Sequence, residues 1–344
     1  MAADATSVRI PELIYRNLEE VVGRDELDAK IAQKKTLVAY IGFAPTGQIH
    51  AGYLVPCMKI RDLTLAGCNV VVMIADIHAM MDERKTPPEL VKARSEYYIR
   101  TLRRLLEILV ADISHVIFTI GSKFQSTADY NMAVLELTSR VPINAALKAG
   151  TEVVKQTKHP MLGSAMYPLM QATDEQFVGQ AALGVPVDIE LGGIDQRKIF
   201  MFSKDWSDSK LTYLMNPIIS LTKVGKMSAS DVNGKIAFMD TREMITDKIK
   251  RAFCCNGDPD CGIMKLMKCV FFPLLSFIDV HLDNDIDKRY TDYDAFESDF
   301  RQGVFLAPHL KSTLIDLLVD IVDRMRLFLM SEDMVALTRS AYPN

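Results

Sequence analysis

The stretch Leu37-Val-Ala-Tyr-Ile-Gly-Phe43 runs directly into Ala44-Pro-Thr-Gly-Gln-Ile-His-Ala-Gly52, and this part of the chain decides the fold. The nearly continuous hydrophobicity of its first half predicts a buried strand of a parallel sheet. Pro45 and Gly47 then predict a turn into a helix. A strand that ends at a helix N-terminus offers free backbone N–H groups and a positive dipole end, which together favour phosphate. We expect His50 to lie at that end.

A second segment, Lys226-Met-Ser-Ala-Ser230, follows much later in the chain. It places a lysine and two hydroxyls between Gly225 and Gly234, the composition expected of a mobile lid over a polyphosphate. Neither segment is a Walker loop or a dinucleotide-binding fingerprint. Each alone is weak evidence, because similar sequences occur in ordinary surface loops. Their order, spacing and context argue against coincidence.

Composition excludes several classes of protein. Hydrophobic residues make up 49% and charged residues 24% of the 344 positions, which is ordinary for a globular protein and argues against extensive disorder. No apolar run reaches membrane-spanning length, and the start of the chain lacks the regions of a signal peptide, so we expect a cytoplasmic protein with no membrane partner. The net charge of −4 means that any RNA contact must use local basic patches.

The six cysteines do not predict a metal site. Four of them cluster between positions 254 and 269, but without paired C-x-x-C spacing or nearby histidines. We expect reduced thiols and no metal held by the protein.

Strands alternate with helices in the first part of the chain. Helices are predicted over 8–34, between His50 and Gly67, and onward from Thr86, and strands over 37–43, 69–75 and 115–120. This alternation predicts an α/β fold with an open, doubly wound parallel sheet, whose ligands bind beyond the carboxyl ends of the strands.

The pattern changes near residue 231. Helices are predicted over 241–253, 263–278, 293–300 and 311–330, with no further strand. We therefore expect one domain over residues 1–230 and a second, all-α domain over residues 231–344.

A third polar motif, Tyr167-Pro-Leu-Met-Gln171-Ala-Thr-Asp174, lies between the two phosphate motifs. On a helix, Tyr167, Gln171 and Asp174 share one face, because they are spaced by four and three. A polar helix surface is the ordinary explanation for such a face. The apolar surroundings and the following Gly192-Gly-Ile-Asp-Gln196 favour a binding pocket instead.

These motifs carry a resemblance to a known family. His50-Ala-Gly52 and Lys226 to Ser230 resemble the HIGH and KMSKS signatures of class I aminoacyl-tRNA synthetases. Over roughly residues 8–330, the chain resembles the tyrosyl-tRNA synthetase family of eukaryotic and archaeal type. The runs that carry this likeness are Ile74-Ala-Asp-Ile-His78, Lys123-Phe-Gln125, Glu152-Val-Val-Lys-Gln156, Tyr167 to Asp174, Gly192 to Phe200 and Leu214-Met-Asn-Pro217.

The resemblance implies a tyrosine–tRNA ligase. Such an enzyme activates L-tyrosine with ATP to tyrosyl-adenylate and transfers the tyrosyl group to the 3′ end of tRNA(Tyr). It implies a Rossmann-like catalytic domain over 1–230 and an all-α anticodon-binding domain over 231–344. It further implies Mg²⁺ with ATP, a homodimer and no DNA partner.

The resemblance also implies roles for individual residues. Tyr40 and Asp174 would bind the substrate phenol, while its amino and carboxyl end and its ring would be held by Tyr167, Gln171, Gln196, Phe124 and Gln125. The ATP-binding positions would be Gly42, Thr46, His50, Gly193, Asp195 and Lys226. Since the reaction needs no side-chain nucleophile, positioning and charge stabilisation would fall to His50, Gly52, Lys226, Ser228 and Ser230.

The chain departs from the family pattern at several places. Ala229 replaces the second lysine of the loop, which shifts phosphate binding onto Lys226 and Lys223. The segment Glu175 to Glu190 is longer than in typical relatives, and either a reshaped pocket wall or a surface bulge would accommodate it. His309 lies where the family reads the anticodon, and it either stacks on a base or caps the following helix.

Further expectations concern assembly. The stretch 141–158, which carries Lys148, Lys155 and Lys158, would form the dimer interface and meet the acceptor stem of tRNA. Two alternatives to a tyrosine–tRNA ligase remain open: a nucleotidyltransferase of the same fold that activates another small molecule, and a non-catalytic RNA-binding relative.

Overall fold

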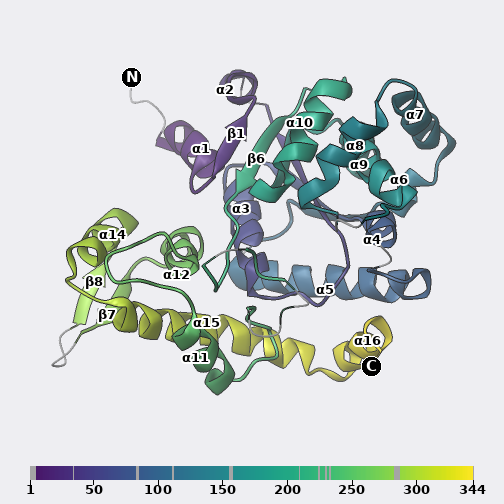
Figure 1. Ribbon diagram of the computed structural model, residues 1–344. Coiled ribbons are helices and arrows are strands. Elements are labelled where there is room, and N and C mark those ends of the chain that lie inside the picture. Colours follow the sequence, from purple (N-terminus) through teal and green to yellow (C-terminus); the bar gives the residue numbers. More distant parts are fainter. Residues whose placement is uncertain are drawn as a thin grey trace.

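The computed structural model describes residues 5–33, 35–82, 85–110, 112–154, 158–208, 210–223, 225–228, 231, 234–282 and 287–343. Its centre is a six-stranded sheet in the order β1-β6-β5-β2-β3-β4 (Figure 1). The strands are β1 (Glu20–Val22), β2 (Val38–Phe43), β3 (Asn69–Ile74), β4 (Val116–Ile120), β5 (Ile189–Gly193) and β6 (Thr212–Asn216).

The order of the strands places a crevice next to β2. Strands β2 to β6 are parallel, and β1 pairs antiparallel with β6. The chain builds outward from β2 through β3 and β4, then returns to the other side of β2 for β5 and β6. The direction of winding therefore reverses between β2 and β5, which is where doubly wound sheets bind their ligands. The predicted α/β fold is confirmed.

Helices cover both faces of this sheet (Figure 1). Ala39 and Ile41 of β2 pack in a core shared with α3 and α5, whereas Val38 and Tyr40 pack toward α7 and α9. Successive side chains of a strand point to opposite faces, so a strand buried on both sides is apolar throughout. The helices of this part are α1 (Ala5–Tyr15), α2 (Arg24–Ala32), α3 (Leu54–Leu65), α4 (Asp76–Met81), α5 (Val91–Leu109), α6 (Ser122–Gln125), α7 (Ala128–Thr138), α8 (Ile143–Ala149), α9 (Leu162–Leu183) and α10 (Arg197–Trp206).

The first residues differ from the prediction of one helical region over 8–34. They form two helices with the short strand β1 between them. Gly23 follows β1 in the left-handed conformation, with φ of +86°, and its carbonyl accepts a hydrogen bond from Thr212 Oγ1 at 2.7 Å. Glycine adopts this conformation without strain, so the chain can turn sharply from β1 into α2.

The part after residue 231 is mainly helical, as expected, but the prediction that it holds no strand is wrong. Strands β7 (Ile278–His281) and β8 (Asp287–Tyr290) form an antiparallel pair, so the helix predicted over 263–278 ends early. Arg289 donates two hydrogen bonds of 2.7 Å to Asp279 across this pair. The helices here are α11 (Arg242–Arg251), α12 (Gly262–Leu266), a π-helical turn over Met267–Phe271, α13 (Phe272–Leu274), α14 (Tyr293–Gln302), α15 (Ala307–Leu329) and α16 (Glu332–Ala341).

One hydrophobic core joins the sheet to the helices at the end of the chain. It contains Ile41 of β2, Leu102 of α5, Leu318 of α15 and Met334 of α16. The packing of α15 and α16 on α5 brings the last helix close to the loops that follow β2. Among the described residues, no helix is both long and apolar enough to span a membrane. All six cysteines are unpaired.

Candidate active site

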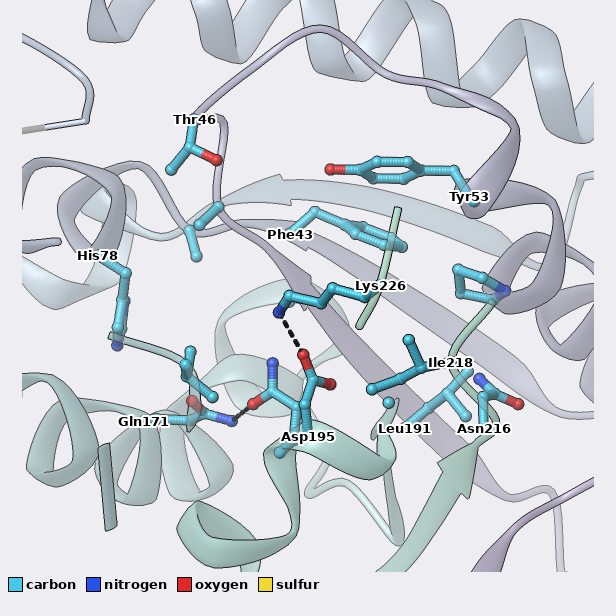
Figure 2. A pocket seen from close by; sticks show the side chains of 18 of the residues that line it. Phe43, Thr46, Tyr53, His78, Gln171, Leu191, Asp195, Asn216, Ile218 and Lys226 are labelled. Atoms are coloured by element: carbon cyan, nitrogen blue, oxygen red, sulfur yellow. Dashed lines mark hydrogen bonds and ion pairs between the residues drawn. The ribbon is translucent and has the colours of Figure 1, made fainter. Parts of the chain in front are cut away.

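A cavity of about 690 Å³ opens at the carboxyl ends of β2, β5 and β6 (Figure 2). Thirteen of the predicted site residues line it, namely Tyr40, Gly42, Thr46, His50, Gly52, Tyr167, Gln171, Asp174, Gly193, Asp195, Gln196, Lys226 and Ser228. Phe124 and Gln125 are buried in the layer behind this wall. Ser230 and Ala229 lie outside the described residues. The segments quoted from distant parts of the sequence therefore meet in one place.

The turn after β2 is fixed by side chains that belong to α5 or directly precede it. Thr86 Oγ1 donates to the Pro45 carbonyl at 2.8 Å, Arg94 Nη1 to the Thr46 carbonyl at 3.1 Å, and Tyr98 Oη to the Gly47 carbonyl at 2.7 Å. Arg94 is buried and also donates to the Ala341 carbonyl at the end of α16, at 2.9 Å. Buried hydrogen bonds to successive carbonyls hold a turn in one conformation.

His50 is neutral, and its hydrogen bond with Gly52 determines which ring nitrogen carries the proton. Its Nδ1 accepts the Gly52 N–H at 3.1 Å and caps the helical turn Ala51–Tyr53. Burial lowers the pKa of His50 to about 4, and the nearby charge of Lys235 adds to this effect. Because Nδ1 is an acceptor, the neutral ring holds its proton on Nε2. His50 therefore offers the cavity a hydrogen-bond donor and no charge.

Gly52 has no room for a side chain. A Cβ atom there would lie 2.8 Å from His50 Cε1 and 3.0 Å from His50 Nδ1. The predicted importance of Gly52 thus has a steric basis, because a larger residue would displace the imidazole.

Lys226 reaches across the cavity from the loop after β6. Its ammonium pairs with the Asp195 carboxylate at 2.6 Å (Figure 2). Backbone pairing anchors this loop, since Met227 N donates to the Ile219 carbonyl at 2.9 Å. Lys223 instead lies over the Phe253 ring, 5.6 Å from its centroid, and it does not line the cavity.

Several buried polar atoms of the residues that line the cavity have no hydrogen-bond partner among the described residues. Two of them are Tyr40 Oη, beside Glu190, and Asp174 Oδ2, which is 3.8 Å from His78 Nε2. The other oxygen of Asp174 accepts from Gln125 Nε2 at 2.7 Å and from Tyr130 Oη at 2.8 Å. Burial raises the pKa of the Asp174 carboxyl to about 7, although these two hydrogen bonds oppose the shift. Buried polar atoms are nearly always paired, so an unpaired donor and an unpaired acceptor in one cavity indicate a ligand hydroxyl.

Three further residues at the cavity were not predicted. His78 of α4 is buried edge-on against Tyr167, with Nε2 3.8 Å from Asp174 Oδ2. Burial lowers its pKa to about 4, so it is neutral. Tyr130 holds Asp174, and Glu190 of β5 lines the cavity. His78 ends one of the runs quoted for the family resemblance, and Glu190 is a charge inside an apolar strand, so both left a signal in the sequence.

The departures from the family pattern have local explanations. Residues 175–183 continue helix α9, which ends at Gly184 with φ of +72°. Of the range 175–190, only Glu190 lines the cavity, and the residues up to 183 belong to the helix. His309 Nδ1 accepts from Leu306 N at 3.0 Å, which confirms the capping role. Lys148 and Lys158 are exposed, and Lys155 lies outside the described residues.

Known proteins are similar in sequence to this chain over most of its length. Residues 32–322 match the family model of tRNA synthetases class I (W and Y). The chain is 37% identical over 340 residues to "Tyrosine--tRNA ligase, cytoplasmic" of Gallus gallus, covering 97% of this chain and 63% of the chicken protein. It is 34% identical over 348 residues to the tyrosine–tRNA ligase of Natronomonas pharaonis, covering 98% of each.

A solved structure shares the architecture as well. The tyrosyl-tRNA synthetase from Archaeoglobus fulgidus, complexed with L-tyrosine, matches with a TM-score of 0.84 and 31% identity, covering 94% of this chain and 99% of that chain. The chain spans 63% of the length of the vertebrate relatives that it matches. With a doubly wound sheet, both motifs at one cavity and a family match over most of its residues, the chain belongs to the class I tRNA synthetase family that comprises the tryptophan and tyrosine enzymes.

Proposed function

We propose that the protein is a tyrosine–tRNA ligase. The observation that carries this proposal is the pair of unpaired atoms on the cavity floor, Tyr40 Oη and Asp174 Oδ2. A phenol is both a donor and an acceptor, so it would donate to the Asp174 carboxylate and accept from the Tyr40 hydroxyl. The names of the relatives and the L-tyrosine in the Archaeoglobus complex support the same ligand.

The same floor would reject phenylalanine. Without a hydroxyl, this ligand would leave both floor atoms buried and unpaired, which costs binding free energy. Tyrosyl-tRNA synthetases are an established instance of this kind of discrimination. Tyr167, Gln171 and Gln196 would hold the amino and carboxyl end of tyrosine, and Phe124 and Gln125 would shape the ring site from behind the wall.

The first step would join tyrosine to ATP. The tyrosine carboxylate attacks the α-phosphorus, a P–O bond to the carboxylate forms, and the bond to pyrophosphate breaks. The protein supplies no nucleophile, so it acts by positioning and by stabilising the charge that develops on the phosphates. His50 would donate a neutral hydrogen bond from Nε2. Lys226 would supply the positive charge.

Lys226 would change partners when ATP binds. In the free protein its charge is neutralised by Asp195 at 2.6 Å. A triphosphate would draw the ammonium away, which would leave the Asp195 carboxylate to accept from a ribose hydroxyl. Gly42, Thr46 and Gly193 would border the nucleotide, Ser228 and Ser230 would shape the loop, and Mg²⁺ would accompany ATP.

The second step would transfer the tyrosyl group to the 3′ end of tRNA(Tyr) in the cytoplasm. We infer a catalytic domain over 1–230 and an anticodon-binding domain over 231–344.

A homodimer is supported by large apolar side chains that are exposed on α7, α8 and the start of α9. These residues, the α7–α9 apolar patch, are Met132, Leu135, Ile143, Met161 and Leu162. Exposed apolar patches of this kind mark protein interfaces.

The test is ATP–pyrophosphate exchange without tRNA, with each of the twenty amino acids in turn. Exchange with tyrosine alone is expected, and tRNA charging is then measured separately. Lys226→Ala should lower the exchange rate by about 100-fold, the loss of one preorganised charged contact. Exchange with another amino acid would support the alternative nucleotidyltransferase. No exchange from folded protein would support the RNA-binding alternative.

A further inference from the structure

A buried carboxyl lies behind the tyrosine site without an ion pair among the described residues. Glu190 is 2% exposed and stands beside Tyr40 in the register of β2 and β5. Its neighbour on the other side is the carboxyl of Glu175, to which Tyr213 Oη donates at 3.1 Å. Burial and the charge of Glu175 raise the pKa of Glu190 well above its ordinary value. A carboxyl is costly at such a position, so its contacts need an explanation.

The contact of Glu190 is with the amide of Gln171. Gln171 Nε2 donates to Glu190 Oε1 at 3.0 Å and to Gln196 Oε1 at 3.0 Å, the second bond being visible in Figure 2. A primary amide has two N–H groups, and these two bonds use both. Gln171 is left with its carbonyl oxygen as an acceptor. Gln196 is left with its amide nitrogen as a donor.

We propose that Glu190 is a positioning residue that fixes the orientation of the Gln171 amide, so that the Gln171 carbonyl oxygen accepts from the ammonium group of the substrate. The inference rests on the proposed tyrosine site. Two glutamines alone can bond in either polarity, because each amide end can donate or accept after a flip. A carboxyl oxygen removes this freedom. Glu190 Oε1 accepts from Gln171 when the carboxyl is ionised, and still accepts when the proton lies on the other oxygen toward Glu175.

Replacement of Glu190 by glutamine would restore the freedom to flip. Its new amide could present either a carbonyl or an N–H to Gln171, and the second arrangement turns the Gln171 nitrogen toward the substrate ammonium. A hydrogen bond to a charged group would then be lost, which corresponds to an affinity loss of about tenfold. The affinity for ligands that lack an ammonium group should not change.

The test compares three ligands by calorimetry: tyrosine, tyramine, which lacks the carboxylate, and 3-(4-hydroxyphenyl)propanoate, which lacks the ammonium. For Glu190→Gln we expect the dissociation constants of tyrosine and tyramine to rise about tenfold and that of the propanoate to change less than about twofold. Glu175→Gln is the matched control, because it alters the same carboxyl pair at the member that accepts from Tyr213. It should affect the three ligands alike.

The outcome does not depend on full folding of the variant, since the ratio of the tyramine and propanoate constants is taken within one preparation. Equal losses for all three ligands in Glu190→Gln, or the same ammonium-selective loss in Glu175→Gln, would overturn the positioning role while the tyrosine site stands. Failure of the wild-type protein to bind tyrosine would overturn the proposed function and this inference together.

Discussion

In the proposed site, Asp174 would set both the specificity and the pH dependence of tyrosine binding. Its Oδ1 is held by Gln125 and Tyr130, so only Oδ2 is free to meet a ligand. Burial is the main reason that its pKa rises to about 7, and the charges of Glu175 and Asp76 add to it. Tyr130 donates to Oδ1 at 2.8 Å, and His78 lies 3.8 Å from Oδ2, where its pKa of about 4 keeps it neutral above that pH.

The affinity for tyrosine should therefore fall as the pH drops below about 7. The pKa is raised, so the carboxyl is ionised above this value and protonated below it. Protonation removes the acceptor that the phenol requires, and the dissociation constant should rise by at most about tenfold per pH unit. Calorimetric titrations between pH 5.5 and 8.5 measure this. Asp174→Asn should bind weakly with a flat profile, and a flat wild-type profile would contradict the role given to Asp174.

Residue identities in this site were predictable where a motif named them, and not where a partner was needed. The roles of Tyr40, Gln171 and Asp174 were expected only because the chain resembles a known family. Glu190 could not be assigned, because its meaning depends on Gln171, a residue 19 positions earlier on a different element. The neutral state of His50 also required the structure. The burial of its imidazole and its proximity to Lys235 cannot be deduced from a linear sequence.

At the scale of elements, helix α9 continues past Asp174 and is locked against the segment that leads into β5. Gly179 lies at this contact, where a Cβ atom would come within 2.5 Å of the Val185 carbonyl oxygen and 2.8 Å of Val187 Cγ1. The segment from Glu175 to Val187 is therefore a packed helix end and connection rather than a loose bulge.

Gly179→Ala should lower the free energy of unfolding by about 1–3 kcal/mol, because the backbone of residue 185 must move. A decrease in the free energy of unfolding would indicate the close contact, because a glycine-to-alanine substitution inside a helix otherwise stabilises the protein by about 1 kcal/mol. Urea denaturation measures the change. Gly150→Ala is the matched control, because its Cβ would meet no atom closer than 3.5 Å. A stabilised Gly179→Ala protein would refute the close contact.

Helix α5 links the last helix to the turn after β2 through Arg94. One guanidinium binds the carbonyls of Ala341, Thr46 and Lys85. Arg94→Lys loses the planar guanidinium that binds these three carbonyls. It should lower the free energy of unfolding by about 2 kcal/mol. It should also raise KM for ATP several-fold in pyrophosphate exchange, with KM for tyrosine unchanged. Arg100→Lys, on the exposed side of α5, is the control, and equal changes in both KM values would argue against the link.

The elements themselves were predictable in proportion to their length and hydrophobicity. Strands β2, β3 and β4 are apolar runs, and the sequence predicted all three. Strands β5 and β6 were not predicted, and β5 contains Glu190 and two glycines, so it is not a continuous apolar run. Strand β1 has only three residues, Glu20–Val22, between two helices, and its pairing with β6 is a tertiary contact. The strands β7 and β8 are four residues each, and the alternation in Ile278–His281 is too short to outweigh a helical pattern.

At the scale of the whole molecule, the α7–α9 apolar patch gives the proposed homodimer a specific surface. Ile143 is 63% and Leu162 75% exposed, although both are large and apolar. Ile143→Glu and Leu162→Glu would bury a charge at a dimer interface, so each should shift the protein toward a monomer in analytical ultracentrifugation. Leu327→Glu on α15 is the control, because that leucine is 73% exposed away from the patch. A wild-type protein that sediments as a monomer would reject the dimer.

The antiparallel strand β1 has a consequence for the behaviour of the molecule in solution. All five residues of β6, Thr212–Asn216, are buried, and β6 would be the outermost strand on that side of the sheet without β1. A bare apolar edge offers a row of unpaired N–H and C=O groups as a template for strand addition by another chain. Strand β1 is now the edge, but it has only three residues, so we expect it to offer a shorter template and to lower the tendency of this edge to aggregate.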